Sequence, residues 1–242
     1  MKNKEIRYVG HLDILGMSDL VHKNFDDAWG MLSDLVEVKD KLSNISIEFL
    51  ETKETVNISD VIKAVTFSDT IVLFTKTNSE IELRCMIVLI TEIFHKAICK
   101  CVPIRAGLSV GEFSFNDEKS MYAGPALIEA YRIGEGSQWL GISLAKSIHE
   151  EAIKLNLQTG GSDLVINWDI PLKDKTINGY VINWPALFAH DLKIKHPITS
   201  EQFYEGFQSS FGSYEDLPNT VKNKYINTVN FMNHQLEQHE KA

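Results

Sequence analysis

Apolar residues along the chain recur with two different periods, and these periods predict a succession of strands and helices. Residues 6–12 have the composition of a short strand, which leads into a turn containing Gly16. The next segment predicts a helix, because its apolar residues recur three and four positions apart and would share one helical face. These residues are Phe25, Ala28, Trp29, Leu32, Leu35 and Val36.

Residues 61–74 predict a β-hairpin. Val61, Val65 and Phe67 would face the same side of its first strand, because side chains alternate along a strand. The triplet Ser68-Asp69-Thr70 then interrupts an otherwise β-rich run, which places Asp69 at or near the hairpin tip. An aspartate in the interior of a buried strand would be costly without a partner, so we expect Asp69 at the tip.

A second helix is predicted after this hairpin. Ser79 and Glu82 have the spacing of a capping box, in which each side chain satisfies a backbone donor of the first helical turn. Pro103 ends any continuation of the helix. Its apolar face comprises Leu83, Met86, Ile87, Ile90, Phe94 and Ala97.

Three more elements follow before residue 134. Residues 104–110 alternate between apolar and other residues, which predicts a strand. Gly111 and Glu112 predict a turn, and a further short strand is expected within residues 113–122. Gly124 and Pro125 open a helix that runs to about residue 133, because proline suits the first helical turn.

The resulting order of strand, helix, strand, strand, helix, strand is the split pattern of ferredoxin-like folds. We therefore expect an α+β fold whose antiparallel sheet carries helices on one face. We also expect a single domain over residues 1–242, with a core at about 6–160 and a largely helical C-terminal extension at about 161–242.

Beyond Gly141, the pattern predicts a helix near residues 143–154 and a strand near residues 179–184. The last helix is expected at about residues 217–237, because five apolar residues there have helical spacing. They are Val221, Tyr225, Val229, Met232 and Leu236.

Composition narrows the function classes. Hydrophobic residues make up 44% and charged residues 24% of the 242 residues, as in ordinary folded proteins. The formal net charge is −9 and the basic residues form no long runs, so binding to nucleic acid is not expected. There is no apolar run of the roughly 20 residues needed to span a bilayer. The three cysteines show no disulfide spacing, so we expect a cytoplasmic protein without membrane attachment.

Two aspartates are the candidates for metal binding. Asp13 is expected at the end of the first strand and Asp69 on the hairpin. Carboxylates at neighbouring strand ends can hold Mg²⁺ or Mn²⁺, which prefer oxygen ligands and keep positions open for phosphate oxygens. Read singly, each aspartate is better explained by a turn or helix-cap role, because exposed aspartates at strand ends are common.

Four segments, in order, resemble the motifs of class III nucleotide cyclases, over residues 6 to about 133. Residues 11–18 resemble the Asp-Ile-x-Gly-Phe motif, and Phe67-Ser68-Asp69 resembles the Gly-Asp of the second strand. Residues 105–111 resemble the Arg-x-Gly-Ile-x-x-Gly strand, and residues 124–132 resemble the Gly-x-x-x-Asn-x-Ala-x-Arg helix.

This resemblance implies a ferredoxin-like cyclase core and a metal-dependent reaction. The carboxylates of Asp13 and Asp69, with the backbone carbonyl of Ile14, would hold two divalent cations. Arg132 would stabilise the α-phosphate in the transition state. The resemblance also implies a head-to-tail homodimer with composite active sites, because metal site and arginine come from opposite protomers.

The resemblance further assigns phosphate-binding residues. Backbone amides of Leu15, Gly16 and Met17 would bind the β- and γ-phosphates at the start of a helix. Arg105 is either another phosphate ligand or a structural residue paired with a carboxylate such as Glu112.

Departures from the cyclase motifs indicate which nucleotide base the site would bind. Ile128 stands where the family has its transition-state asparagine, and Val65 and Met121 stand where adenylate cyclases have polar base-reading residues. The chain is also similar to the Pycsar pyrimidine cyclases of bacterial anti-phage defence, including Ile182-Asn183-Trp184-Pro185. That similarity implies UTP, or else CTP, as substrate, and a cyclic UMP or cyclic CMP product that a separate effector protein reads.

Two other interpretations remain open. The missing asparagine is compatible with a catalytically inactive cyclase-like module for nucleotide binding or dimerisation. The chain could also be a purine cyclase that binds ATP or GTP through unusual base contacts.

Overall fold

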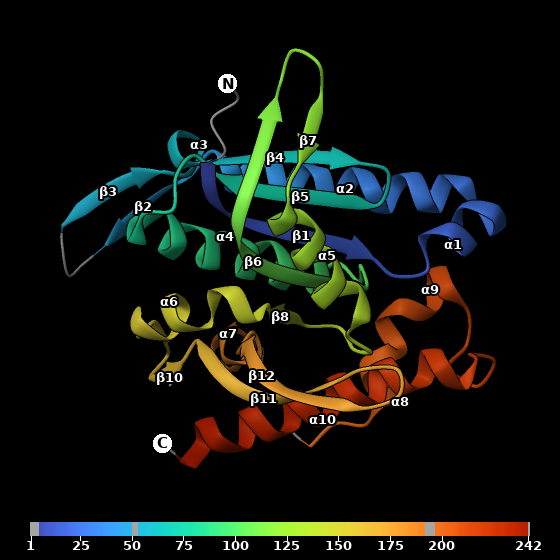
Figure 1. Ribbon diagram of the computed structural model, residues 1–242. Coiled ribbons are helices and arrows are strands. Elements are labelled where there is room, and N and C mark those ends of the chain that lie inside the picture. Colours follow the sequence, from blue (N-terminus) through green and yellow to red (C-terminus); the bar gives the residue numbers. More distant parts are fainter. Residues whose placement is uncertain (1–4, 50–52, 192–196, 242) are drawn as a thin grey trace.

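A computed structural model describes residues 5–49, 53–191 and 197–241, and these are organised around one eight-stranded sheet (Figure 1). Its strands are β1 (Glu5–Ile14), β4 (Ile62–Phe67), β5 (Thr70–Thr75), β6 (Ile104–Asn116), β7 (Met121–Ala123), β8 (Ile142–Leu144), β11 (Val165–Pro171) and β12 (Thr176–Ile182). Two small two-stranded sheets pair β2 (Ser46–Phe49) with β3 (Glu54–Asn57), and β9 (Gln158–Thr159) with β10 (Ser162–Asp163).

The helices surround this sheet. In chain order they are α1 (Met17–Lys23), α2 (Phe25–Ser43), α3 (Ile58–Val61), α4 (Glu80–Cys99), α5 (Pro125–Gly136), α6 (His149–Lys154), α7 (Pro185–Asp191), α8 (Ser200–Tyr204), α9 (Gln208–Phe211) and α10 (Asn219–Lys241). Two short 3₁₀ helices are η1 (Lys146–Ile148) and η2 (Glu205–Phe207). None of the helices described is both long and apolar enough to cross a membrane.

The main sheet has the strand order β11-β12-β8-β6-β1-β5-β4, with β7 paired to β6. The elements β1, α2, β4, β5, α4 and β6 follow the predicted split order, so the predicted α+β fold class is confirmed. One pairing in the sheet differs from the predicted antiparallel arrangement. The strands β6 and β8 run parallel, whereas all other paired strands described in the main sheet are antiparallel. The helix α5 makes that crossover possible, since parallel strands need a long connection.

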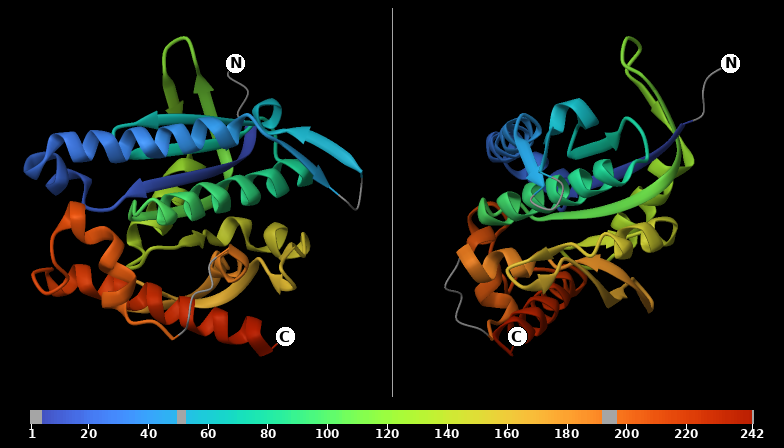
Figure 2. Two further views of the ribbon diagram at one scale, coloured as in Figure 1. Left: turned by 180° about the vertical axis from the view of Figure 1, so that it is seen from behind. Right: turned by 90° about the vertical axis from the view of Figure 1, so that its left-hand side faces the viewer.

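Helices cover both faces of the sheet, so the prediction that they lie on one face is wrong. A Cβ atom added at Gly10 would meet Ile90 and Met86 of α4, whereas one added at Gly107 would meet α5. His11, next to Gly10, pairs with Gly107, so these two glycines face opposite sides. In Figure 1, α5 and the β6–β7 hairpin lie on the side of the sheet that faces the viewer. The left view of Figure 2 shows the opposite side, where α2 and α4 lie in front of the strands. We refer to the side that faces the viewer in Figure 1 as the open face, because the helices leave Phe67 of β4 on this side 82% exposed.

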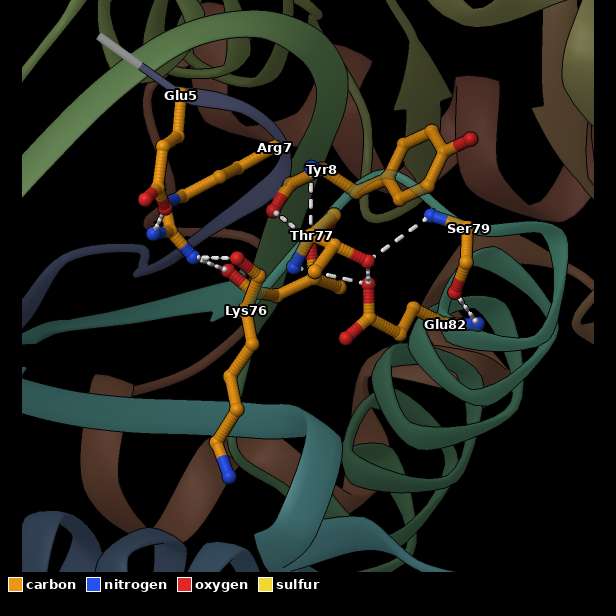
Figure 3. A network of polar contacts seen from close by, with 8 residues as sticks. Glu5, Arg7, Tyr8, Lys76, Thr77, Ser79 and Glu82 are labelled. Carbon is orange, nitrogen blue, oxygen red and sulfur yellow. Dashed lines mark hydrogen bonds and ion pairs between the residues drawn. The ribbon is translucent and has the colours of Figure 1, made fainter. Parts of the chain in front are cut away.

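The β4–β5 hairpin and α4 form as predicted. The turn between the strands holds Ser68 and Asp69, with Ser68 at a φ of 54°. All six predicted apolar residues of α4 are buried. The capping box forms only in part: Ser79 accepts a hydrogen bond from the Glu82 amide at 3.4 Å, but the Glu82 carboxylate binds the Thr77 amide at 2.9 Å (Figure 3).

The same region contains an arginine that ties two strand ends together (Figure 3). The buried Arg7 guanidinium donates to the carbonyl oxygen of Thr75 at 2.6 Å and to that of Lys76. Arg7 also forms an ion pair with Glu5 and a cation–π contact with Phe115, whose ring centre lies 5.0 Å from Arg7 Cζ. These contacts fix the end of β5 against β1, so the start of α4 has a defined position.

Two predicted elements are wrong, namely the turn at residues 111 and 112 and the continuous helix near residues 143–154. Residues 111 and 112 do not turn the chain, because β6 continues through them to Asn116, and the turn comes at residues 117–120. Gly111 serves a close approach instead, since an added Cβ atom would lie 3.5 Å from the Ala126 Cβ of α5. The expected helix near 143–154 is likewise divided into β8, η1 and α6.

On α2, the predicted apolar face is only partly the buried one. Met31, Leu35 and Val38 are buried, whereas Phe25 and Trp29 are 58% and 61% exposed and their rings stack. The predicted C-terminal helix is present as α10, and four of its five predicted residues are buried. The extension also supplies β11 and β12, so it widens the sheet as well as adding helices.

Candidate active site

Asp13 and Asp69 lie side by side at one end of the sheet. Asp13 is the penultimate residue of β1 and faces Thr70, the first residue of β5. The Ile14 amide donates a hydrogen bond to the Asp69 carbonyl oxygen at 3.1 Å, which fixes the hairpin turn against β1. The local fold therefore brings together two of the predicted metal ligands, and places Ile14 between them.

The nearest partner of Asp13 is Arg105, which lies directly opposite on β6. The Nε and Nη2 atoms of Arg105 are each 3.0 Å from Asp13 Oδ2, and Nη1 donates to the Glu135 carbonyl oxygen at 2.5 Å. Glu112 lies seven residues further along the same strand, roughly 23 Å away at the usual strand rise, so it is not the partner. Arg105 is thus held by Asp13 and by the end of α5.

The carboxylates present fit a hard divalent cation. The Oδ1 atom of Asp13 accepts no hydrogen bond from the described residues, and the Asp69 side chain has no hydrogen bond or ion pair there. The described residues contain no group of three or more His, Cys, Asp or Glu side chains arranged for a metal. Two carboxylates are nevertheless sufficient for Mg²⁺, which keeps several waters and takes its other ligands from substrate phosphates.

The turn after β1 has two available amides rather than three. The Leu15 amide, which was predicted to bind phosphate, donates to the Pro103 carbonyl oxygen at 2.7 Å in this structure. The amides of Gly16 and Met17 donate to no group in the part of the chain that the structure describes. Gly16 has a φ of 76°, a left-handed conformation that favours glycine, and α1 begins at the next residue.

Arg132 lies elsewhere on the chain. Its side chain is exposed on α5 and lines an open depression of about 530 Å³ together with Lys146, Lys173 and Lys175. The carboxylates Glu129 and Asp174 lie on the same depression. The fold thus gathers three lysines around Arg132, away from the residues that surround Asp13. Sequence reasoning missed the three lysines, because they come from η1 and from the β11–β12 turn.

The helix α5 presents a different side to Asp13. Tyr131 makes an edge contact with the His11 ring at a centroid distance of 5.2 Å. Burial lowers the pKa of His11, the partly offsetting cause being the Asp13 carboxylate. The His11 Nδ1 atom is buried and has no partner among the described residues. We found no sequence signal for this histidine, which follows the strand alternation that also positions Asp13.

The two positions expected to contact the base both lie on the open face. Val65 on β4 is partly buried against Val9, Phe74 and Phe113. Met121 begins β7, and half of its side chain is exposed. Lys63, two residues before Val65, pairs with Asp117 at the hairpin tip, so the β6–β7 hairpin is anchored over β4.

Comparison with known proteins identifies the fold. No protein-family model matches the chain, and no curated protein sequence matches it. Solved structures do match: the catalytic core of a rhodopsin-guanylyl cyclase with converted specificity, bound to ATPalphaS, has a TM-score of 0.53 at 16% identity, covering 74% of this chain and 95% of that one. A bacterial light-regulated adenylyl cyclase has a TM-score of 0.50 at 13% identity, covering 74% and 91%.

A third match is the adenylate/guanylate cyclase/hydrolase from Silicibacter pomeroyi, with a TM-score of 0.50 at 15% identity, covering 75% of this chain and 98% of that one. The chain therefore has the fold of class III nucleotide cyclase catalytic domains. About a quarter of it has no counterpart in these three structures.

Proposed function

We propose that this chain is a metal-dependent nucleotide cyclase, which converts a nucleoside triphosphate into its 3′,5′-cyclic monophosphate and pyrophosphate. The observation that carries the proposal is the pair Asp13 and Asp69, which a cyclase fold holds side by side through the Ile14–Asp69 hydrogen bond. In the reaction, the ribose 3′-oxygen attacks the α-phosphorus and the bond to pyrophosphate breaks. The hydroxyl proton passes to solvent.

The chain's own residues would prepare this reaction. Asp13 and Asp69 would hold one or two Mg²⁺ or Mn²⁺ ions, with the Ile14 carbonyl oxygen as a further ligand. A bound divalent cation supplies a lower pKa for the 3′-hydroxyl and neutralises phosphate charge. Arg105 fixes the orientation of Asp13 by binding one carboxylate oxygen, which leaves the other for the cation. Gly16 and Met17 would offer their amides to phosphate oxygens.

The distribution of charge supports a homodimer with composite sites. Asp13 and Asp69 form one half of a site, and Arg132 with its three neighbouring lysines forms the other half at a different place. Four large apolar side chains are exposed on the β4–β5 hairpin, β7 and α5, where a second protomer would cover them. They are Phe67 at 82%, Met121 at 51%, Ile128 at 51% and Tyr131 at 43% exposure.

A pyrimidine nucleoside triphosphate is the favoured substrate, with UTP preferred over CTP. Val65 and Met121 offer no polar groups, so they would not select adenine through hydrogen bonds. The similarity of the sequence to pyrimidine cyclases of anti-phage defence supports this choice. By the same similarity, the cyclic UMP or cyclic CMP product would act as a second messenger for a separate effector protein in the cytoplasm.

The test is incubation of the purified chain with each ribonucleoside triphosphate and Mn²⁺, with products identified by mass. Cyclic UMP or cyclic CMP, lost on chelation and in Asp69→Asn, supports the whole proposal. Cyclic AMP or cyclic GMP supports the cyclase and contradicts the choice of base. No cyclic product from any triphosphate contradicts the proposed activity.

A further inference from the structure

A pocket of about 250 Å³ lies where the C-terminal extension meets the turn after β1. Leu15 and Gly16 form one wall, and the other walls come from α8–α10. The contact is close, because a Cβ atom added at Gly16 would lie 3.1 Å from Phe211 Cε1. Figure 1 shows α9 beside α1 at this place. The aromatic side chains that line the pocket are Tyr204, Phe211 and Tyr225.

Lys224 of α10 lines this pocket and is the one lysine among its lining residues. It is half-buried, and its ammonium group has no hydrogen bond or ion pair with the residues described. Burial lowers the pKa of Lys224, Arg105 lowers it further, and Asp13 raises it. The ammonium group therefore lies within electrostatic reach of the Asp13–Arg105 pair, although it comes from the far end of the sequence.

An unpaired, half-buried cation costs free energy unless a ligand compensates it. The carboxylates that share this pocket, Asp19 and Asp216, are both exposed on its rim. Neither has an ion pair with Lys224. The pocket thus has an apolar aromatic wall, a solvated acidic rim and one inner cation beside the turn that follows Asp13. This arrangement suits the charged end of a ligand whose other end lies at Asp13.

We propose that Lys224 binds the terminal phosphates of the substrate, so that the C-terminal extension contributes to the active site on the same protomer as Asp13. The inference rests on the proposed cyclase function. It gives α10, which belongs to the C-terminal extension, a role at the active site. Bond cleavage leaves these phosphates as pyrophosphate, and Lys224 holds that product.

Inorganic pyrophosphate with Mg²⁺ is the direct probe, because it lacks the base and the ribose. Its affinity, measured by calorimetry without turnover, should fall roughly tenfold to a hundredfold in Lys224→Gln, as expected for loss of one charge-assisted hydrogen bond. Lys224→Arg should restore part of the affinity. Cyclic UMP should bind the wild type and both variants equally, since it lacks these phosphates.

Lys241→Gln is the matched control, because it removes one positive charge from the exposed far end of the same helix. It should leave pyrophosphate affinity unchanged. Unchanged pyrophosphate affinity in Lys224→Gln, or no pyrophosphate binding by the wild type, overturns the inference. An equal loss of pyrophosphate and cyclic UMP binding overturns it too, since that indicates general damage. Absence of turnover with intact, Lys224-dependent pyrophosphate binding contradicts the cyclase activity and supports the role of Lys224.

Discussion

Asp13 and Arg105 face each other across the antiparallel strands β1 and β6, and the guanidinium contacts a single carboxylate oxygen through two nitrogen atoms at 3.0 Å. Both side chains are mostly buried, with exposures of 23% and 11%. The pair gives Asp13 a cationic partner in the absence of metal. It also places a positive charge next to the oxygen that a divalent cation would use, so Arg105 both orients Asp13 and opposes metal binding.

Arg105→Gln should therefore have two effects of opposite sign. Without metal, the free energy of unfolding should fall by about 1–3 kcal/mol, because charge-assisted hydrogen bonds are lost in a mostly buried place. Mg²⁺ should bind more tightly, because the repelling charge is gone. Urea unfolding in chelator and calorimetry with Mg²⁺ measure the two effects. Lys41→Gln, an exposed change on α2, is the control. Weaker Mg²⁺ binding in Arg105→Gln would show that Arg105 assists the metal site.

Glycine positions test how closely α5 approaches the sheet. A Cβ atom at Gly107 would lie 2.0 Å from the Ala130 carbonyl oxygen and 2.8 Å from the Gly134 amide nitrogen, and neither backbone can move freely. Gly107→Ala should therefore cost several kcal/mol of stability, roughly 3 or more, as overpacking in a core does. Gly30→Ala, on α2 with nothing within 4 Å, should stabilise by about 0.5–1 kcal/mol. Chemical denaturation of both variants decides; equal effects contradict the described packing.

The buried thiol of Cys85 should make stability depend on pH in the alkaline range. Burial raises the pKa of Cys85 to about 11 from 9.0. The unfolded chain thus loses this proton first, so the contribution to stability is complete below pH 9 and decreases as the pH rises to about 11. One such group contributes a slope of at most about 1.4 kcal/mol per pH unit.

Cys85→Ala should flatten this slope in urea titrations at pH 9 and pH 11, whereas Cys99→Ala on the exposed helix end should not. Parallel slopes for the wild type and Cys85→Ala would show that the thiol is not shielded in the native state.

Much of the fold could be predicted because the period of the apolar residues indicates whether a segment forms a strand or a helix. The β4–β5 hairpin and α4 show periods of 2 and 3.6, and both form where predicted. The strand β1 also forms where its composition predicted it. The role of Gly111 could not be predicted, since a glycine in a strand can mark a turn or a close approach, and only the tertiary contact with Ala126 distinguishes them. The exposure of Trp29 was also beyond reach, because an apolar stripe does not reveal whether a partner covers it.

Some residues of the candidate site could also be predicted from the sequence, and others could not. Asp13 and Asp69 could be predicted from their places at strand ends and from the motifs around them. Arg105 was found, but its partner was not, because cross-strand register depends on pairings that the local sequence does not specify. Lys173 and Lys224 gave no signal, since each reaches its pocket through a contact between segments far apart in the sequence.

The central claim is that one protomer supplies the carboxylates and its partner supplies Arg132. Asp69→Asn and Arg132→Ala should each abolish cyclase activity alone. When the two variants are mixed and allowed to exchange subunits, half of the dimers become heterodimers, each with one intact site, so about a quarter of wild-type activity should return. An Asp69→Asn/Arg132→Ala double variant mixed with inactive partners should recover nothing. Failure of the two single variants to complement each other, despite demonstrated subunit exchange, would contradict the composite site.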